Sequence, residues 1–242
     1  MPNQIPLIVD RRGSVLSLSL NNPSKKNALN SEIMGALFAA IEETKKYEEL
    51  RVIVIRGEGS VFCSGADVKN WEPNQLQILL KSITECSLPT IAEVNGACLG
   101  GGMGLICACD FVVAKSSTRF GFPEVRIGMI PAVILPYVAR KIRLSNIQEL
   151  FITGERFGNN RAESLGILYH ESDLDELVSK IVKGGPNAQK AIKSMLNKDI
   201  ISKSSSVRDA ELANLISRIQ KGSECVEGIN SFLEKRQPKW GK

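Results

Sequence analysis

The fold of this chain is decided by ten residues, Asn95-Gly96-Ala97-Cys98-Leu99-Gly100-Gly101-Gly102-Met103-Gly104, which run directly into the apolar segment Leu105 to Ala108. We predict that the three consecutive glycines open a helix. Backbone N–H groups at a helix start lie at the positive end of its dipole, and glycine has no Cβ to keep a ligand oxygen away. The stretch indicates a site for an anion or oxyanion, with close helix-to-strand packing as the alternative.

Glycine-rich turns before helices also bind nucleotides, but the spacing here fits neither nucleotide motif. The dinucleotide motif requires another glycine three residues after its second one, and the two possible registers hold Leu105 or Cys107 there. The phosphate-binding loop ends in Gly-Lys-Ser/Thr, whereas no lysine follows Gly96 before Lys115. We therefore expect no nucleotide triphosphate site.

A second turn of small residues follows the strand-like run Val52 to Ile55 and reads Val61-Phe62-Cys63-Ser64-Gly65-Ala66-Asp67-Val68. Two such turns can supply two convergent N–H donors. The pair Phe-Cys-Ser-Gly-Ala-Asp and Asn-Gly-(x)3-Gly-Gly-Gly resembles the crotonase (enoyl-CoA hydratase/isomerase) superfamily.

The resemblance extends over nearly the whole chain. Single motifs of this kind are weak, but six in the family's order are a strong signal. Besides the two turns, the matching segments are 22–29 with Lys25-Lys26-Asn27-Ala28-Leu29, 108–114 with Cys109-Asp110, 120–131 with Pro123-Glu124, the turn Thr153-Gly154-Glu155, and 227–236.

The residue pattern itself predicts alternating strands and helices in one layered core. Strand-like runs lie at 15–20, 52–55, 90–94 and 111–114, and an Asn30 cap precedes a helix whose apolar face carries Ile33, Leu37 and Ile41. From about Asn187 the pattern is helical only, over 191–196, 207–219 and 226–235.

The resemblance implies an α/β fold, a crotonase-like β-β-α spiral core with a C-terminal helical segment. We expect residues 1–186 to form the core with an acyl-CoA site. Residues 187–242 are then the helical segment that covers an active site or serves oligomerisation, within a homotrimer or hexamer.

The resemblance also implies how an acyl-CoA thioester is held. Its carbonyl oxygen would lie between the backbone N–H groups of Ala66 and Gly101, because negative charge develops on that oxygen when chemistry occurs beside a thioester. The matching positions for CoA are Lys25, Lys26, Ala28, Ser64, Asp67 and Val68, with turn capping as the alternative role of Asp67. Coenzyme A enters as part of the substrate, and no cofactor is implied.

Hydratases of this family use two glutamates, and the chain has one of them. The first position is occupied by Gly104 and the second by Glu124. One carboxylate can move a proton from the α-carbon by itself. Orienting and activating a water for addition is harder without a second carboxylate. The pattern resembles the Δ3,Δ2-enoyl-CoA isomerases, with Glu124 acting alone; an ion pair with Arg126 or Arg119 is its alternative role.

Two further departures from the family affect the site. The candidates to replace the missing acid are Glu72, Glu85 and Glu93. Because Glu93 interrupts an apolar strand, we expect its carboxylate to face solvent, a subunit contact or a cationic partner. Apolar residues at 132–138 replace a glycine-rich stretch and suggest a reshaped pocket for short or branched acyl groups.

Composition excludes several other classes. The single histidine, His170, is expected to be structural, so the six cysteines have no partners for a zinc site or a Cys-His nucleophile, and we expect buried thiols. The net charge of +5 and the 5% aromatic content do not indicate nucleic acid, and no apolar run is long enough to span a membrane. We expect a cytoplasmic protein or a mature organellar chain.

Three functions remain open from the sequence. The first is isomerisation by Glu124 alone, the second is hydration or decarboxylation with a substituted second acid, and the third is acyl-CoA binding without catalysis.

Overall fold

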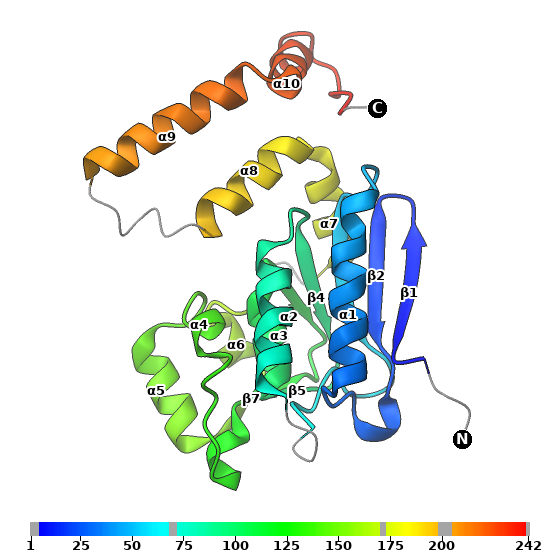
Figure 1. Cartoon of the computed structure of the whole chain (residues 1–242), viewed down its shortest axis with the longest axis vertical. Coiled ribbons are helices and arrows are strands. Elements are labelled where there is room, and N and C mark those ends of the chain that lie inside the picture. Colours follow the sequence, from blue (N-terminus) through cyan, green and yellow to red (C-terminus); the bar gives the residue numbers. More distant parts are fainter. Residues whose placement is uncertain (1–4, 68–71, 170–172, 198–204, 241–242) are drawn as a thin grey trace.

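The computed structural model describes residues 5–67, 72–169, 173–197 and 205–240, with only the backbone of 205–210. Val68 and His170, both considered above, lie outside the described residues. Figure 1 shows an α/β core with a group of helices extending from one end.

The main sheet has five strands in the order β1-β2-β3-β4-β6. The pair β1–β2 is antiparallel, whereas the pairs β2–β3, β3–β4 and β4–β6 are parallel. Helices lie in the connections between the parallel strands. The strands are β1 (Leu7–Arg12), β2 (Val15–Leu20), β3 (Val52–Gly57), β4 (Thr90–Val94) and β6 (Phe111–Ala114). All four runs predicted as strands are therefore confirmed.

Alternate residues of β3 face opposite sides of this sheet. Ile53 and Ile55 belong to the large core on the side of α1 (Ser31–Glu43), α2 (Pro73–Glu85) and α3 (Gly101–Ala108). Val52 and Val54 pack on the other side with Leu177 of α7 (Leu174–Lys183). Successive side chains of a strand point to opposite faces, so a continuous apolar run is required where both faces are covered.

Helices α1 to α3 cover one face of the sheet (Figure 1). The Asn30 side chain caps α1 by accepting a hydrogen bond from the Ile33 N–H at 2.9 Å, as the sequence predicted. The helices are α1 (Ser31–Glu43), α2 (Pro73–Glu85), α3 (Gly101–Ala108), α4 (Leu135–Val138), α5 (Leu144–Thr153), α6 (Asn159–Ser164), α7 (Leu174–Lys183), α8 (Pro186–Asn197), α9 (Ser205–Gln220) and α10 (Ser223–Leu233), with short 3-10 turns at Pro23–Lys25, Thr44–Lys46 and Pro123–Ile127.

A second sheet of three strands positions the start of α3. Its order is β5 (Ala97–Leu99), β7 (Arg119–Gly121) and β8 (Arg156–Phe157), and β5 runs straight into the helix. At the junction, Gly100 has a φ of +51° and donates a backbone hydrogen bond to the Gly121 carbonyl at 3.0 Å. Side-chain-bearing residues rarely adopt this conformation, which explains a glycine at the turn.

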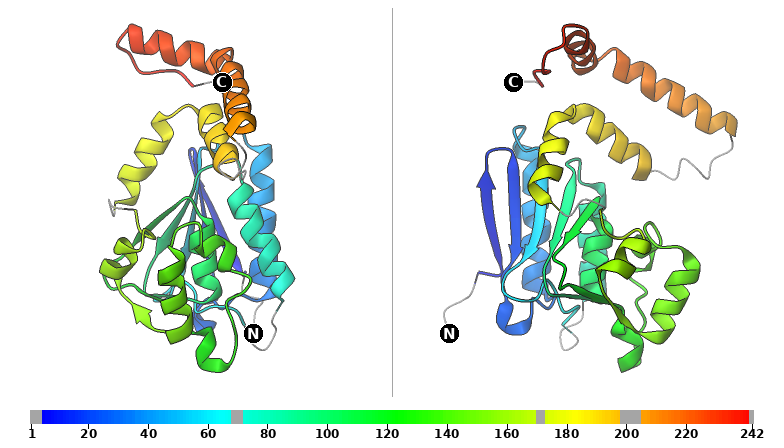
Figure 2. Two further views of the ribbon diagram at one scale, coloured as in Figure 1. Left: turned by 90° about the vertical axis from the view of Figure 1, so that its left-hand side faces the viewer. Right: turned by 180° about the vertical axis from the view of Figure 1, so that it is seen from behind.

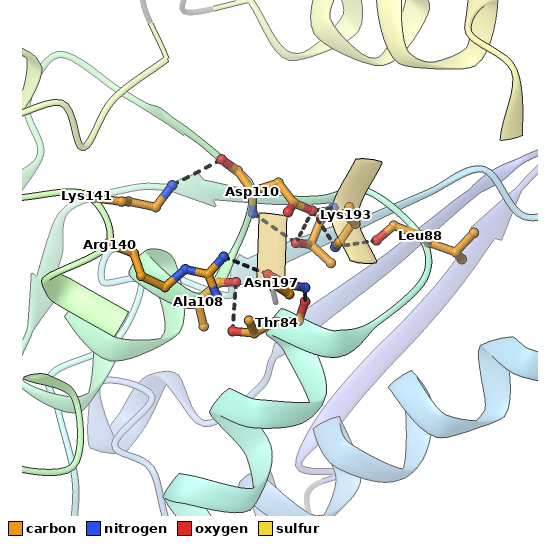
Figure 3. Close-up of polar contacts among 9 residues, drawn as sticks. Thr84, Leu88, Ala108, Asp110, Arg140, Lys141, Lys193 and Asn197 are labelled. Atoms are coloured by element: carbon orange, nitrogen blue, oxygen red, sulfur yellow. Dashed lines mark hydrogen bonds and ion pairs between the residues drawn. The ribbon is translucent and has the colours of Figure 1, made fainter. Parts of the chain in front are cut away.

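The C-terminal helices begin against the core and then leave it. Helix α8 is tied to the core by Lys193, whose ammonium donates to Asp110 at 2.5 Å and to the Leu88 carbonyl at 2.8 Å (Figure 3). Helices α9 and α10 extend away from the sheet in all three views (Figures 1 and 2). The all-helical pattern starts earlier than predicted, because α7 already precedes residue 187, and α10 ends at Leu233 rather than Lys235.

The expectation of buried thiols is confirmed for all cysteines but one. Five of the six are buried free thiols, and Cys225 is half-buried. Burial raises the pKa of Cys63, Cys107 and Cys109 to about 12, so these sulfurs stay protonated and pack as small apolar groups. Among the described helices, none is long and apolar enough to cross a bilayer.

Candidate active site

A cavity of about 180 Å³ opens beside the start of α3. Its walls come from the Ser64 turn, from α2, from the first turn of α3 and from the segment that follows β7. The lining residues are Ser64, Gly65, Ala66, Leu76, Gly100, Gly101, Pro123, Glu124, Arg126, Ile127 and 129–134.

The two predicted donors, Ala66 and Gly101, lie next to each other on this cavity. A Cβ built on Gly101 would stand 3.4 Å from the Ala66 nitrogen. Within the described chain, neither backbone N–H has a hydrogen-bond acceptor, although the groups around them are paired. Two N–H donors without acceptors at one cavity wall form a site for a ligand oxygen.

Backbone hydrogen bonds fix the position of the Ala66 turn. The Leu29 N–H donates to the Gly65 carbonyl at 2.8 Å, and the Asp67 N–H donates to the Leu29 carbonyl at 2.9 Å. Gly65 has a φ of +109°, and a Cβ there would meet the Leu99 carbonyl oxygen at 3.3 Å. The turn therefore requires glycine at this position, and Ala66, which lines the cavity, is held between two hydrogen bonds.

Glu124 brings a carboxylate to the same wall from the 3-10 turn Pro123–Ile127. Its Oε1 lies 3.2 Å from the position of a Cβ on Gly100, and its Oε2 is buried without a hydrogen-bond partner. Burial raises the pKa of Glu124 above that of an ordinary glutamate. Within the described residues Glu124 forms no ion pair, so the alternative of a pair with Arg126 or Arg119 is wrong.

The position of the absent first glutamate is filled by an isoleucine. A Cβ on Gly104 would lie 2.4 Å from Cγ2 of Ile134 and 3.2 Å from Cδ1 of Leu80. Ile134 is 2% exposed and also lines the cavity. A side chain at residue 104 would need Ile134 to move, so the space beside Gly104 is apolar.

None of the three candidate replacement acids lines the cavity. Glu72 precedes α2, Glu85 pairs with Lys81 at 4.0 Å, and Glu93 pairs with Arg56. The pair confirms the expectation that Glu93 has a cationic partner. Among the described residues, Glu124 is the only carboxylate that lines this cavity.

The predicted CoA turn packs against the Ser64 turn without lining the cavity. The Ser64 N–H donates to the Lys26 carbonyl at 3.0 Å, and the Ala28 N–H donates to the Lys25 carbonyl at 3.1 Å. Buried Asn27 holds this turn by donating from its side chain to the Glu58 and Val61 carbonyls at 2.9 and 2.7 Å. The two lysines are exposed beside the turn, and of the predicted CoA positions Ser64 and Ala66 line the cavity with Gly101.

Sequence reasoning placed Ile134 at the acyl pocket only as part of the segment 132–138, and it did not identify Leu76 as a lining residue. Ile134 lies inside the apolar segment 132–138, whose departure from the glycine-rich family pattern was the available signal. Leu76 has the periodicity of an ordinary core residue on α2, and no local pattern distinguishes it.

Comparisons with known proteins cover nearly the whole chain. A family model described as enoyl-CoA hydratase/isomerase matches residues 10–242. The 2,3-dehydroadipyl-CoA hydratase of Escherichia coli is 30% identical over 96% of this chain and 97% of its own, and the mevalonyl-coenzyme A hydratase sidH of Aspergillus fumigatus is 28% identical over 93% and 91%. The solved structure of Pseudomonas aeruginosa AtuE has a TM-score of 0.91 at 29% identity, covering 98% of this chain and 100% of that one.

Proposed function

Because this chain belongs to the enoyl-CoA hydratase/isomerase family and has its crotonase fold, we propose that it isomerises Δ3-enoyl-CoA to Δ2-enoyl-CoA thioesters with Glu124 as the single acid–base residue. In this proposal the N–H groups of Ala66 and Gly101 bind the thioester oxygen. The CoA of the substrate supplies the only non-protein group, held at Lys25, Lys26, Ala28, Ser64, Asp67 and Val68.

The proposed reaction uses charge that develops on one oxygen. Glu124, ionised, removes a proton from the α-carbon, and the electron pair of that C–H bond moves into the thioester carbonyl to give an enolate. The two N–H donors stabilise the enolate oxygen. Protonated Glu124 then returns the proton at the γ-carbon, so the double bond moves by one position and the carboxylate is restored.

The observation that carries this proposal is the filled space beside Gly104. Addition of water across a double bond needs a water that is both activated and oriented, and an isoleucine methyl group offers it no hydrogen bond. A proton transfer between two carbons needs only one base that reaches both. The unpartnered Oε2 of Glu124 is free to make that contact.

Hydration is the second candidate, and the names of the relatives favour it. Most of them are called hydratases, including the Escherichia coli and Aspergillus fumigatus proteins. A hydratase or decarboxylase without the first glutamate would use bound water or a carboxylate of the substrate in its place. Binding without catalysis is the third candidate.

Product analysis separates these functions. Purified protein is given a short 3-enoyl-CoA or its 2-enoyl isomer, and products are identified by chromatography and mass spectrometry. Isomerisation predicts 2-enoyl-CoA from the first substrate, with no 3-hydroxyacyl-CoA from either. Formation of 3-hydroxyacyl-CoA at a comparable rate would establish the hydratase, and tight binding with no product would establish the binder.

We further propose that residues 187–242 serve assembly into trimers or hexamers of a cytoplasmic protein. In the described residues this segment does not line the cavity of its own chain. It carries apolar side chains exposed by half or more, at Ile216, Ile229, Phe232 and Leu233, as expected of a surface that another subunit covers. Light scattering of the full chain measures the oligomer, and a monomer at micromolar concentration would contradict this assignment.

A further inference from the structure

Resting on the proposed function, we infer that the substrate carries a short acyl chain of about four to six carbons, and that Ile134 sets this limit. The cavity has a closed inner end and an open outer end. Ile134 at the inner end is 2% exposed, whereas Ile127 and Ile130 at the outer end are 62% and 77% exposed. We place the carbonyl of the acyl group at Ala66 and Gly101 and its chain toward the buried Ile134, which lines the same cavity.

The distance available to that chain follows from the helix. Gly104 lies three residues after Gly101, which is about 4.5 Å along the axis of α3. At that height the Ile134 methyl group occupies the space beside the helix, 2.4 Å from a Cβ on Gly104. Only a few carbon–carbon bonds fit between the donors and this obstacle.

The wall behind Ile134 is part of the protein core. Leu80 and Val138 are fully buried there, and Leu76 closes the side toward α2. Interiors of this kind are close-packed, so a longer chain would have to displace several side chains at once. The cavity volume of about 180 Å³ is also below the roughly 300 to 1,000 Å³ of pockets for drug-sized ligands.

Saturated acyl-CoA thioesters test this inference without any turnover. Calorimetric titration of the purified full chain with butyryl-, hexanoyl-, octanoyl- and decanoyl-CoA gives the affinity for each length. We expect affinity to rise from four to six carbons and then to fall. Each buried methylene strengthens binding by about fourfold, so a steady rise through decanoyl-CoA would overturn the inference.

Substitution of the limiting residue is the second part of the test. Ile134→Ala removes three carbons from the inner end, and we expect octanoyl-CoA to bind about 10-fold more tightly than to the wild type. Ile134→Val keeps the Cγ2 methyl group and removes only Cδ1, so it should shift the preference in the same direction by much less. The matched control is Ile78→Ala on the outer face of α2, which is 55% exposed and does not line the cavity.

The outcomes distinguish this inference from the proposed function. If no acyl-CoA binds, both the chain-length inference and the proposed function are rejected. If all four acyl-CoA thioesters bind and both variants show the wild-type dependence of affinity on chain length, Ile134 is rejected as the limiting residue. The proposed reaction at Glu124 would be unaffected by that result.

Discussion

The polar groups at the two ends of α3 differ in whether they have hydrogen-bond partners. At the first turn, the N–H groups of Ala66 and Gly101 and the Oε2 of Glu124 have no partner within the described residues. Just after the last turn, the Asp110 carboxylate accepts hydrogen bonds from the Thr90 N–H at 2.8 Å and from the Thr90 hydroxyl at 2.9 Å, besides the Lys193 ammonium.

Side chains of neighbouring elements donate further hydrogen bonds to the same end of α3 (Figure 3). Lys141 donates to the Asp110 carbonyl at 3.1 Å, and Thr84 donates to the Ala108 carbonyl at 3.4 Å. Unpaired buried polar groups cost stability, so a fold retains them where they serve a ligand. This contrast supports the proposal that the first turn of α3 serves the chemistry and that the contacts after its last turn support the structure.

The largest effect should come from Glu124→Gln, which removes the base and keeps its shape. We expect turnover of a 3-enoyl-CoA to fall by about 100- to 10,000-fold, because Gln cannot accept the α-proton. Affinity for butyryl-CoA should change little. Glu85→Gln, at an exposed glutamate away from the cavity, is the control, and wild-type turnover by Glu124→Gln would remove this residue from the mechanism.

The next largest effect is expected for Gly101→Ala, which tests the unpaired donors. Its Cβ would lie 3.4 Å from the Ala66 nitrogen and 3.2 Å from Cδ1 of Leu29, beside the two donors. We expect kcat/KM to fall by about 100- to 1,000-fold, the effect of losing an oxyanion donor. Gly35→Ala is the control because a Cβ there meets nothing within 4 Å; equal activity of both variants would contradict the assigned site.

The opposite end of α3 should respond in stability instead of activity. Lys193 is 8% exposed, and Lys193→Met leaves the Asp110 carboxylate without its cation. We expect the free energy of unfolding to fall by on the order of 3 kcal/mol, measured by urea denaturation, with kcat/KM of the folded variant retained. The exposed pair Lys180–Glu176 supplies the control Lys180→Met, which should cost less than about 1 kcal/mol.

The smallest effect concerns stability at the first turn. Burial raises the folded-state pKa of Glu124, so its neutral form favours folding below the unfolded-state pKa, and this contribution is lost as pH rises through the folded pKa. Glu124→Gln should therefore raise the free energy of unfolding at pH 7 by up to about 1 kcal/mol, a small gain because the carboxylate is only half-buried. A clear loss at pH 7, or a gain that grows at pH 4, would show that Glu124 is structurally paired.

The fold and the contents of the site differ in how far the sequence predicts them. Positive φ angles require glycine at residues 65 and 100, so these turns can be recognised directly from the residue type. The same is true of the Asn30 cap and of the apolar runs of β3 and β4. Local patterns of this kind predict elements and turns because their causes are local.

The contact between Gly104 and Ile134 has no local cause. The two residues are 30 positions apart, and only the packing of the segment after Pro131 onto α3 brings them together. The sequence indicated that the first glutamate is absent, but not that an isoleucine fills its place. The ties of Lys193 to Asp110 and to Leu88 likewise depend on where α8 packs.

Exchange of α-protons tests the central claim most directly. Butyryl-CoA can be neither hydrated nor isomerised, so its exchange in deuterated water reports enolate formation alone. Mass spectrometry of butyryl-CoA incubated with the wild type, Glu124→Gln and Lys193→Met measures the rate. We expect α-deuterium with the wild type and with folded Lys193→Met, and none above buffer with Glu124→Gln. Bound butyryl-CoA that does not exchange with the wild type, or exchanges equally with Glu124→Gln, would contradict it.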